Sequence, residues 1–349
     1  MNQEREPPSR REFFSGATAA LAQTAEPPGK IDCQSHLFSE EFLRFLEKRK
    51  TSPYVYRQGE DRYVVVGEWR RRLMPQHTDA AAKIAAMDAA GIEKAALSIN
   101  DPGPELFGSD SPAVARMLND FIAGTVRRYP TRLFGLAVLP FSSTDAMLGE
   151  LERCFGKLGM KGILLYSNLK GRFPDESDFR PLFAEAEKRG IPVLLHPAAP
   201  VTYEATSGYN MAAGLGLMFD TTIALARLIL AGVLEQHPRL KLVCPHVGGA
   251  LPYLIGRLDH QTMALKRGAE NIRKPPSEYL RTIYLDAVSP ISLAIRYGID
   301  FVGLERMLYS SDHPWVDPKL ITAEIRKLRL SPGDEAKIFS GNARKLFGV

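Results

Sequence analysis

Short apolar runs alternate with longer amphipathic segments over most of this 349-residue chain, and this alternation strongly limits the possible folds. Apolar runs without regular polar alternation are typical of strands buried on both faces, as in a parallel sheet covered by helices. Eight such runs separated by helix-like segments predict an α/β protein with a (β/α)8 TIM-barrel fold. The predicted strands are residues 30–33, 95–99, 133–139, 161–165, 191–195, 240–244, 282–285 and 307–309.

Residues 30–349 show no change of composition that would mark a linker, so we expect one barrel domain. A closing helix is predicted at residues 332–349, with Ser331 as its N-cap because Asp334 follows at the third helical position. The other predicted helices are residues 80–90, 113–129, 145–158, 179–189, 219–237 and 290–297.

Residues 1–29 are expected to form a leader outside the barrel. Residues 9–14 read Ser-Arg-Arg-Glu-Phe-Phe, and a small, weakly apolar run at 15–22 follows. This pattern resembles a twin-arginine export signal and predicts transfer to the periplasm; the alternative is a disordered arm on a cytoplasmic protein. No apolar run elsewhere has the length of a membrane span, so none is predicted.

The charge balance favours a small anionic ligand over a nucleic acid. The formal net charge is +5 and the pI is about 9.0, but the basic residues are scattered among 40 acidic ones. Nucleic-acid-binding proteins usually gather basic residues on one face, and here the densest group is only Arg70 to Arg72. We therefore expect a small anionic substrate and no nucleic-acid partner.

Histidine and aspartate follow several of the predicted strands, at the point where each strand ends. His196 follows the run 191–195 and precedes a proline, His246 follows 240–244, and Asp312 follows 307–309. On the first strand, Gln34 and His36 are two residues apart, so they point to the same side of an extended backbone. Since the carboxyl ends of parallel strands meet at one rim of a barrel, these side chains should lie together.

Such a cluster requires a common partner, because histidine and aspartate are costly to leave unpaired near a core. A divalent metal ion bound by imidazoles and a carboxylate, with one position open, supplies that partner. The alternative is that each residue is hydrogen-bonded separately at the entry of its own loop. We expect the metal site.

Two long connections should border the mouth of the barrel, because the loops after the strands form it. Residues 40–78 follow the first strand and are predicted to form a small hairpin or lid, and residues 198–217 follow the strand that ends at His196. Arg62 and Arg70, with Arg71 and Arg72 beside them, could hold a substrate carboxylate, or could be solvated loop charges.

At several of these positions the chain resembles the amidohydrolase superfamily, in the branch of aminocarboxymuconate semialdehyde decarboxylase and gamma-resorcylate decarboxylase. The resemblance spans residues 31–349, which is nearly all of the chain after the predicted leader. It depends on Ile31-Asp32-x-x-x-His36, Met87-Asp88-x-x-Gly91, Leu194-Leu195-His196-Pro197, His246-Val247-Gly248-Gly249, Ser311-Asp312-His313-Pro314 and Gly341-Asn342-Ala343.

The resemblance implies that His36, His196 and Asp312 bind one metal ion, and that His246 acts as acid or base, with Asp312 also handling protons. Zinc is the ion it implies. Gln34 departs from the family pattern, which has His or Glu there, so Gln34 could bind weakly, act through water, or leave the ion to the other ligands. An oxygen ligand in place of an imidazole makes Mn²⁺ the alternative ion. The lid arginine of the aminocarboxymuconate enzyme also has no counterpart, since Val64 stands near that position.

The resemblance favours a metal-dependent, non-oxidative decarboxylase of a small aromatic or unsaturated carboxylic acid. The same residues would also serve a hydrolase that attacks a lactone, ester or amide with a metal-activated water. A third possibility is a degenerate member that binds an aromatic acid without converting it, because one ligand is altered. Members of this family often self-associate, so a homo-oligomer is also expected.

Overall fold

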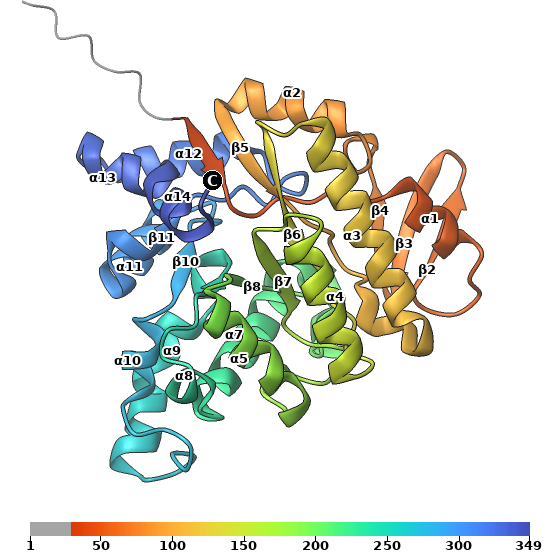
Figure 1. The fold of residues 1–349 in the computed structure, drawn as a ribbon. Helices are drawn as coiled ribbons and strands as arrows, with labels where there is room; N and C mark the ends of the chain where they lie inside the picture. Colours follow the sequence, from red (N-terminus) through yellow and green to blue (C-terminus); the bar gives the residue numbers. More distant parts are fainter. Residues whose placement is uncertain (1–28) are drawn as a thin grey trace, which may run out of the picture.

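The computed structural model describes residues 29–349, which form a curved parallel sheet with helices around it, a TIM-like fold (Figure 1). The leader predicted at residues 1–29 lies outside the described residues, apart from Gly29. All eight predicted strands are present, and their order in the sheet is their order in the sequence. They are β1 (Lys30–Asp32), β5 (Ile92–Leu97), β6 (Leu133–Ala137), β7 (Gly162–Tyr166), β8 (Val193–His196), β9 (Leu242–Cys244), β10 (Tyr284–Asp286) and β11 (Met307–Leu308).

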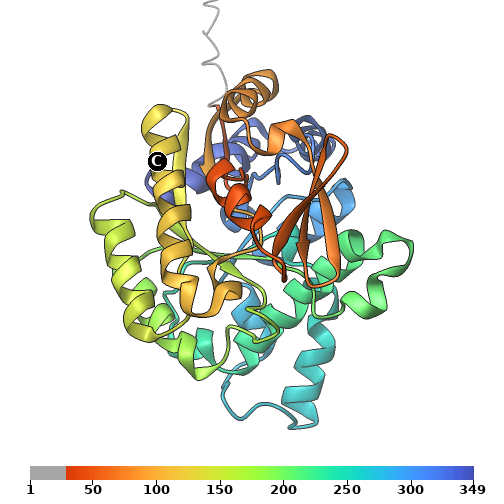
Figure 2. The same ribbon diagram turned by 90° about the vertical axis from the view of Figure 1, so that its right-hand side faces the viewer.

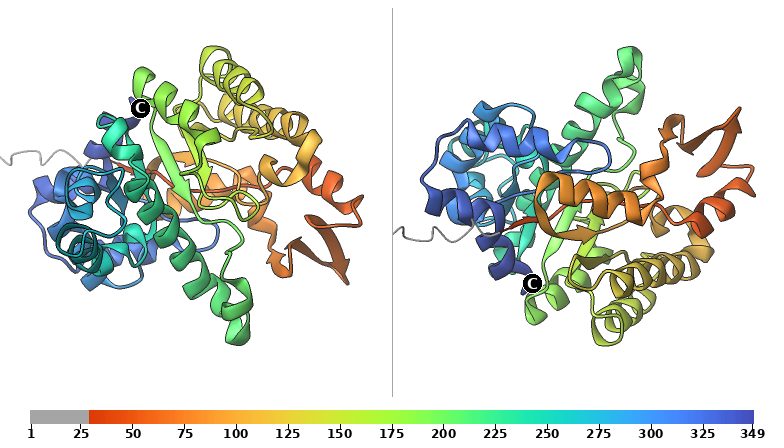
Figure 3. Two further views of the ribbon diagram at one scale, coloured as in Figure 1. Left: turned by 90° about the horizontal axis from the view of Figure 1, so that it is seen from below. Right: turned by 90° about the horizontal axis from the view of Figure 1, so that it is seen from above.

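Helices surround the strands when the molecule is seen from below or above (Figure 3). Amphipathic helices cover a parallel sheet because its strands are apolar on both faces. The longer helices are α1 (Glu40–Glu47), α2 (Ala80–Ala90), α3 (Ser111–Arg128), α4 (Thr144–Gly156), α5 (Arg180–Arg189), α7 (Leu217–Leu230), α9 (Leu251–Asp259), α11 (Ser292–Val302) and α12 (Pro318–Arg326). The shorter ones are α6 (Tyr203–Thr206), α8 (Val233–Gln236), α10 (Pro276–Leu280), α13 (Pro332–Ala336) and α14 (Asn342–Phe347).

The first and last strands of the sheet are joined by backbone hydrogen bonds beyond their ends. The Cys33 N–H donates to the Tyr309 carbonyl (3.0 Å), and the Asp312 N–H donates to the Gln34 carbonyl (2.9 Å). The His36 N–H donates to the His313 carbonyl (2.8 Å). These bonds place the segment after β1 against the segment after β11, although nearly the whole chain separates them.

Glycines end two of the helices that lead into strands, and both were visible in the sequence. Gly91 follows α2 and Gly190 follows α5, each with φ of 65°. This left-handed conformation lets the chain leave a helix without the steric cost that a Cβ would add. The turn at Gly190 sends the chain directly into β8 and so delivers His196 to the carboxyl end of that strand.

Two helix predictions need correction. The predicted helix at 219–237 is two helices, because Gly232 has φ of 74° and separates α7 from α8. The closing helix predicted at 332–349 is also interrupted, by a five-residue π-helical turn, Lys337–Gly341, between α13 and α14. Its predicted cap is confirmed, because the Ser331 hydroxyl accepts the Asp334 N–H at 3.2 Å.

The long connection after β1 holds α1 and a three-stranded antiparallel sheet rather than a hairpin alone. Its strands are β2 (Tyr54–Gln58), β3 (Asp61–Val66) and β4 (Trp69–Leu73), and this small sheet stands beside α1 at one side of the molecule (Figure 2). Along β4, Trp69 and Leu73 are buried whereas Arg70 and Arg72 are exposed. Because side chains alternate along a strand, Arg71 shares the inner face with Trp69.

One segment of the described residues, Ala212–Leu230, has the length and mean hydropathy of a membrane-spanning helix. Its 18-residue window is 44% buried within the fold. A core helix of a globular protein passes the same test, and the buried face of α7 is what a helix packed on a sheet requires.

His77, in the turn that leads from β4 to α2, carries a test of stability against pH. Its Nδ1 accepts the Met74 N–H at 2.9 Å, and the Trp315 ring lies 4.3 Å away. Burial lowers the pKa of His77 to about 4. The unfolded chain, with a histidine pKa near 6.5, therefore takes up a proton between about pH 6.5 and 4 that the folded protein does not. The neutral, buried His77 therefore contributes fully to the free energy of unfolding above about pH 6.5, and this contribution declines as the pH falls toward 4.

We expect His77→Gln to remove this pH dependence. Between pH 7 and pH 5, the free energy of unfolding of the wild type should fall relative to that of the variant by on the order of 1 kcal/mol. Urea unfolding of metal-free protein at the two pH values measures the difference. The control is His260→Gln, which replaces an exposed histidine. The free energies of unfolding of the wild type and of this control should differ by the same amount at pH 7 and at pH 5. If the difference between the wild type and His77→Gln were also the same at both pH values, the prediction would be wrong.

Candidate metal and active site

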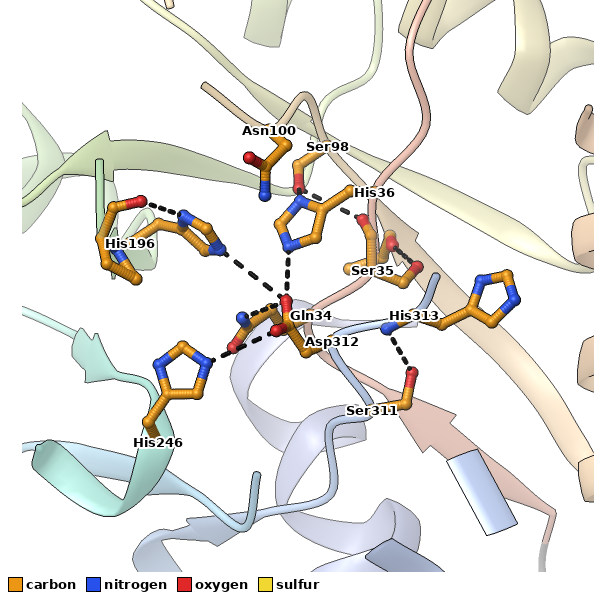
Figure 4. Close-up of polar contacts among 12 residues, drawn as sticks. Gln34, Ser35, His36, Ser98, Asn100, His196, His246, Ser311, Asp312 and His313 are labelled. Atoms are coloured by element: carbon orange, nitrogen blue, oxygen red, sulfur yellow. Dashed lines mark hydrogen bonds and ion pairs between the residues drawn. The ribbon is translucent and has the colours of Figure 1, made fainter. Parts of the chain in front are cut away.

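Four strand ends bring polar side chains to one rim of the sheet, as predicted (Figure 4). His36 lies four residues beyond β1, and His196 is the last residue of β8. His246 follows β9 after one proline, and Asp312 lies four residues beyond β11. All four side chains point toward one another in the close-up, with the Asp312 carboxylate at the centre.

Three of these residues lie close enough to share a cation. One ligand atom from each of His36, His196 and Asp312 lies within 4.8 Å of the others. The Asp312 Oδ1 is 3.1 Å from His36 Nε2 and 4.0 Å from His196 Nε2. Two imidazoles and one carboxylate form a donor set that suits a first-row divalent metal ion.

The hydrogen bonds around His196 also support a metal site. Its Nδ1 donates to the Pro197 carbonyl at 2.8 Å, which leaves the lone pair on Nε2. The Nε2 atom is buried and has no hydrogen-bond partner within the described residues. A buried, unpaired nitrogen directed at a carboxylate is costly unless a cation lies between them, so the residues present fit a metal ion.

Burial and neighbouring charges set the protonation of the cluster. Burial, with a contribution from His196, lowers the pKa of His36 to about 4, which keeps its imidazole neutral. Burial alone would raise the pKa of Asp312, but the surrounding histidines hold it well below its usual range. A neutral imidazole and an ionised carboxylate are the forms that bind metal ions.

His246 stands on the other side of the same carboxylate. Its Nε2 is 3.6 Å from Asp312 Oδ2, and its ring centroid is 6.4 Å from that of His196. Burial alone would lower the pKa of His246, but the carboxylates of Asp312 and Asp286 outweigh it and raise the pKa. A histidine that holds its proton more strongly than usual suits the role of a proton donor.

Gln34 lies within the cluster but contacts Asp312 through its amide nitrogen. The Gln34 Nε2 donates to Asp312 Oδ1 at 3.0 Å. The other amide atom, Oε1, is buried and has no hydrogen-bond partner in the part of the chain that the structure describes. Gln34 therefore orients the carboxylate in this structure, and its carbonyl oxygen remains free to serve as a weak ligand.

We expect Gln34→His to tighten metal binding, because imidazole is a stronger ligand than an amide oxygen. The dissociation constant for Mn²⁺ or Zn²⁺ should fall by about tenfold or more. Metal titration in a competing chelator measures it, with exposed Gln58→His as the matched control. An unchanged dissociation constant would place position 34 outside the set of ligands.

A buried network behind the ligands was not predicted. The Lys83 ammonium is fully buried and donates to the His36 carbonyl at 3.2 Å, and it lies 3.2 Å from His313 Nδ1. The Asp32 carboxylate accepts the Ser311 N–H at 2.9 Å and also the Ser311 hydroxyl proton. Burial lowers the pKa of Lys83 to about 8 and raises that of Asp32 to about 6. Lys83 is the one charged residue among the first seven residues of α2, and that signal was available in the sequence.

A cavity of about 400 Å³ opens onto the cluster. His196, His246 and Asp312 line its floor, and the connection after β8, predicted to border the mouth, contributes Asn210 and Leu217. Two tryptophans, Trp69 from β4 and Trp315, form apolar walls around it. The cavity is large enough for a small aromatic acid and holds a few polar groups at one end, as ligand sites usually do.

The arginines predicted to bind substrate are placed differently from each other. Arg62 does not line the cavity, because its guanidinium pairs with Glu40 at 2.8 Å and with Glu47 at 3.5 Å. Arg70 borders the cavity but is an exposed residue on the outer face of β4. Arg62 is therefore engaged by acidic residues outside the cavity, and strand alternation turns Arg70 away from the inner face that carries Trp69.

Arg71 is the arginine that faces the site. Its Nη1 donates to Asn100 Oδ1 and to Asp101 Oδ1, both at 2.6 Å. The guanidinium carbon lies 4.4 Å from the Trp69 ring centroid, and the Nε atom is buried without a hydrogen-bond partner among the described residues. The alternation Trp69-x-Arg71-x-Leu73 was the signal in the sequence that could have identified it.

Comparison with known proteins agrees with this geometry. The family model described as Amidohydrolase matches residues 31–349. The 2-amino-3-carboxymuconate-6-semialdehyde decarboxylase of Dictyostelium discoideum is 26% identical over 92% of this chain and 92% of its own length. The gamma-resorcylate decarboxylase of Rhizobium radiobacter is 29% identical over 81% of this chain and 91% of its own.

A solved structure shows the same fold. It is the dihydroxybenzoic acid decarboxylase from Polaromonas sp. JS666 with bound manganese and the inhibitor 2-nitroresorcinol. The TM-score is 0.77 at 24% sequence identity, over 92% of this chain and 97% of that one. The fold, the cluster at the strand ends and the family match agree, and the chain belongs to the amidohydrolase family, in the branch of its decarboxylases.

Proposed function

We propose that this protein is a metal-dependent, non-oxidative decarboxylase of a small aromatic or unsaturated carboxylic acid. The observation that carries the proposal is the arrangement of His36, His196 and Asp312 within 4.8 Å, with His246 beside Asp312. The relatives support decarboxylation over hydrolysis, because both curated relatives named above are decarboxylases.

A divalent cation held by His36, His196 and Asp312 would supply positive charge to polarise the carboxylate and the neighbouring oxygen of a substrate. Manganese is the ion we propose first, because the Polaromonas structure holds it and because the amide oxygen of Gln34 suits it better than zinc. Zinc is the second candidate.

The chemistry of the chain's own residues centres on His246. During decarboxylation the bond between the ring carbon and the carboxyl carbon breaks, and its electron pair stays on the ring carbon. The imidazolium of His246 gives its proton to that carbon as carbon dioxide leaves, and it recovers a proton from solvent. The raised pKa of His246 favours the protonated form that this step needs.

We further propose that the strands close into a (β/α)8 barrel and that the small sheet β2–β4 acts as its lid. The bonds from the segment after β1 to the segment after β11 support the closure. Arg71 supports the lid, because it ties β4 to Asn100 and Asp101 beside the cavity. A lid at this position would keep water from the reacting carbon.

A panel of acids tests the proposed activity. Protein reconstituted with Mn²⁺ is incubated with dihydroxybenzoates, hydroxybenzoates and an unsaturated dicarboxylic acid, and with a set of lactones and esters. We expect release of carbon dioxide from at least one acid, and loss of that release when a chelator removes the metal. Release of acid from a lactone or ester without carbon dioxide would overturn the proposal in favour of a hydrolase. Metal binding without any turnover would favour a non-catalytic binder.

We also propose that the free Nε–H of Arg71 binds the substrate carboxylate, and replacing Arg71 tests this contact. We expect Arg71→Met to raise KM by about tenfold or more, because the free Nε–H of a guanidinium binds a carboxylate oxygen strongly. Steady-state kinetics with the acid identified above measures it. Arg62→Met, which alters a surface ion pair, is the matched control and should leave KM unchanged. Equal KM values for the two variants would contradict the assignment.

A further inference from the structure

Asp286, the last residue of β10, lies directly beneath the turn that carries His246. It is fully buried. Its Oδ1 accepts the backbone N–H of His246 at 2.7 Å and that of Val288 at 3.1 Å. Strands β9 and β10 are neighbours in the sheet, with Cys244 opposite Leu285. Asp286 therefore stands beside the point where the chain leaves β9.

The turn that Asp286 contacts has an unfavourable backbone. His246, Val247, Gly248 and Gly249 have φ of 54°, 56°, 79° and 62°. The two glycines adopt such angles readily, but His246 and Val247 each incur a cost of on the order of 1 kcal/mol or more. Residues in this conformation persist only where surrounding contacts hold them.

Contacts within the turn do not involve the N–H of His246. The Gly248 N–H donates to the Pro245 carbonyl at 2.9 Å, and the Gly249 N–H donates to the His246 carbonyl at 3.0 Å. The N–H of His246 is held from another strand, by the carboxylate of Asp286. One carboxylate oxygen of Asp286 thus accepts the N–H groups of both His246 and Val288, which suits a contact that must hold a strained residue.

The direction of the imidazole depends on this backbone. With the turn in place, His246 Nε2 is 3.6 Å from Asp312 Oδ2 and lines the cavity. The Nδ1 atom of His246 has no hydrogen-bond partner within residues 29–349, so no side-chain bond at that end orients the ring. The backbone conformation is then the main constraint on where the proton donor points.

We propose that Asp286 is a positioning residue for His246, which fixes the strained turn through its hydrogen bond to the backbone and so directs the imidazole at the substrate. This inference rests on the decarboxylase function proposed above. Asp286 does not line the cavity and would not touch substrate, so its effect should fall on kcat rather than on KM or on metal content.

Two variants separate the hydrogen bond from the buried volume. Asp286→Ala removes the acceptor, whereas Asp286→Asn keeps a side-chain carbonyl oxygen of the same shape. We expect Asp286→Ala to lower kcat by about tenfold to a hundredfold, with KM and bound Mn²⁺ within about twofold of wild type. Asp286→Asn should restore most of kcat. A folded Ala variant with wild-type kcat, or an Asn variant as slow as the Ala variant, would overturn the proposal.

A matched control exists at another strand end. The side chain of the buried Asn119 accepts the Val138 N–H at 2.9 Å, just beyond the end of β6. This strand end carries none of the histidines of the site. Asn119→Ala should lower the melting temperature about as Asp286→Ala does, but should leave kcat unchanged. An equal loss of kcat in this variant would mean that general destabilisation explains both, and would overturn the positioning role.

A crystal structure of Asp286→Ala separates this inference from the proposed function. If wild-type protein releases no carbon dioxide from any acid, the proposed function fails, but the position of His246 can still be measured. We expect the distance between His246 Nε2 and Asp312 Oδ2 to lengthen beyond 3.6 Å in the variant. An unchanged turn and an unchanged imidazole would overturn the role of Asp286 whatever the activity.

Discussion

Replacing Asp312 with alanine should abolish decarboxylation and most of the metal binding. The carboxylate is the one anionic group among the three ligands and accepts a hydrogen bond from the Gln34 amide. Its loss leaves two imidazoles, which carry no negative charge and whose ring centroids lie 4.5 Å apart, to hold a divalent cation. Removing a residue that hydrogen-bonds to a metal ligand typically lowers the metal affinity about 10- to 100-fold. Removing a direct ligand should therefore lower it more than about 100-fold.

Metal analysis and carbon dioxide release, measured on the same preparation of Asp312→Ala, test this expectation. Asp175→Ala, which removes a carboxylate that pairs with Arg227 and does not line the cavity, is the control and should keep both metal and rate. Circular dichroism establishes that each variant is folded. If the Asp312 variant retained a full equivalent of metal, Asp312 would have to be removed from the set of ligands.

His246→Ala should separate metal binding from turnover. The His246 imidazole approaches Asp312 from the cavity side and is not one of the three clustered ligands. We therefore expect bound metal to stay near the wild-type amount while kcat falls by on the order of a hundredfold or more, the usual contribution of a positioned acid or base. KM should change little, because the proton donor acts mainly in the transition state.

The matched control for this variant is His260→Ala, which removes an exposed histidine beyond α9. It should leave kcat, KM and metal content unchanged. A rate loss in His246→Ala that merely followed a loss of metal would assign His246 to the ligands. An unchanged rate would exclude it as the proton donor.

Much of the fold followed from local patterns along the chain. The apolar runs marked all eight strands, and the helices predicted at 80–90 and 179–189 end where Gly91 and Gly190 follow them. The helix prediction across Gly232 was wrong because an apolar pattern continued through a residue whose left-handed backbone ends α7. Hydrophobic periodicity does not report a single change of backbone conformation.

The candidate site was predictable in part because strand ends are local features. His36, His196, His246 and Asp312 each follow an apolar run, and the parallel arrangement brings such positions to one rim. The choice among the arginines could not be made in the same way. Arg62 and Arg70 were named as candidates beside the alternative of solvated loop charges, yet Arg71 faces Asn100 and Asp101, because the pairing of β3 with β4 sets which side of the strand turns inward.

The sequence by itself determined the alternation of strands and helices, the family, and the histidines and aspartate at the strand ends, because these depend on residue type and near neighbours. Only the tertiary structure decided that Gln34 donates to Asp312, that Lys83 lies behind His36, and that Asp286 holds the turn of His246. These contacts join residues from different strands and helices. Their partners are set by strand register and by burial, which cannot be read from neighbours along the chain.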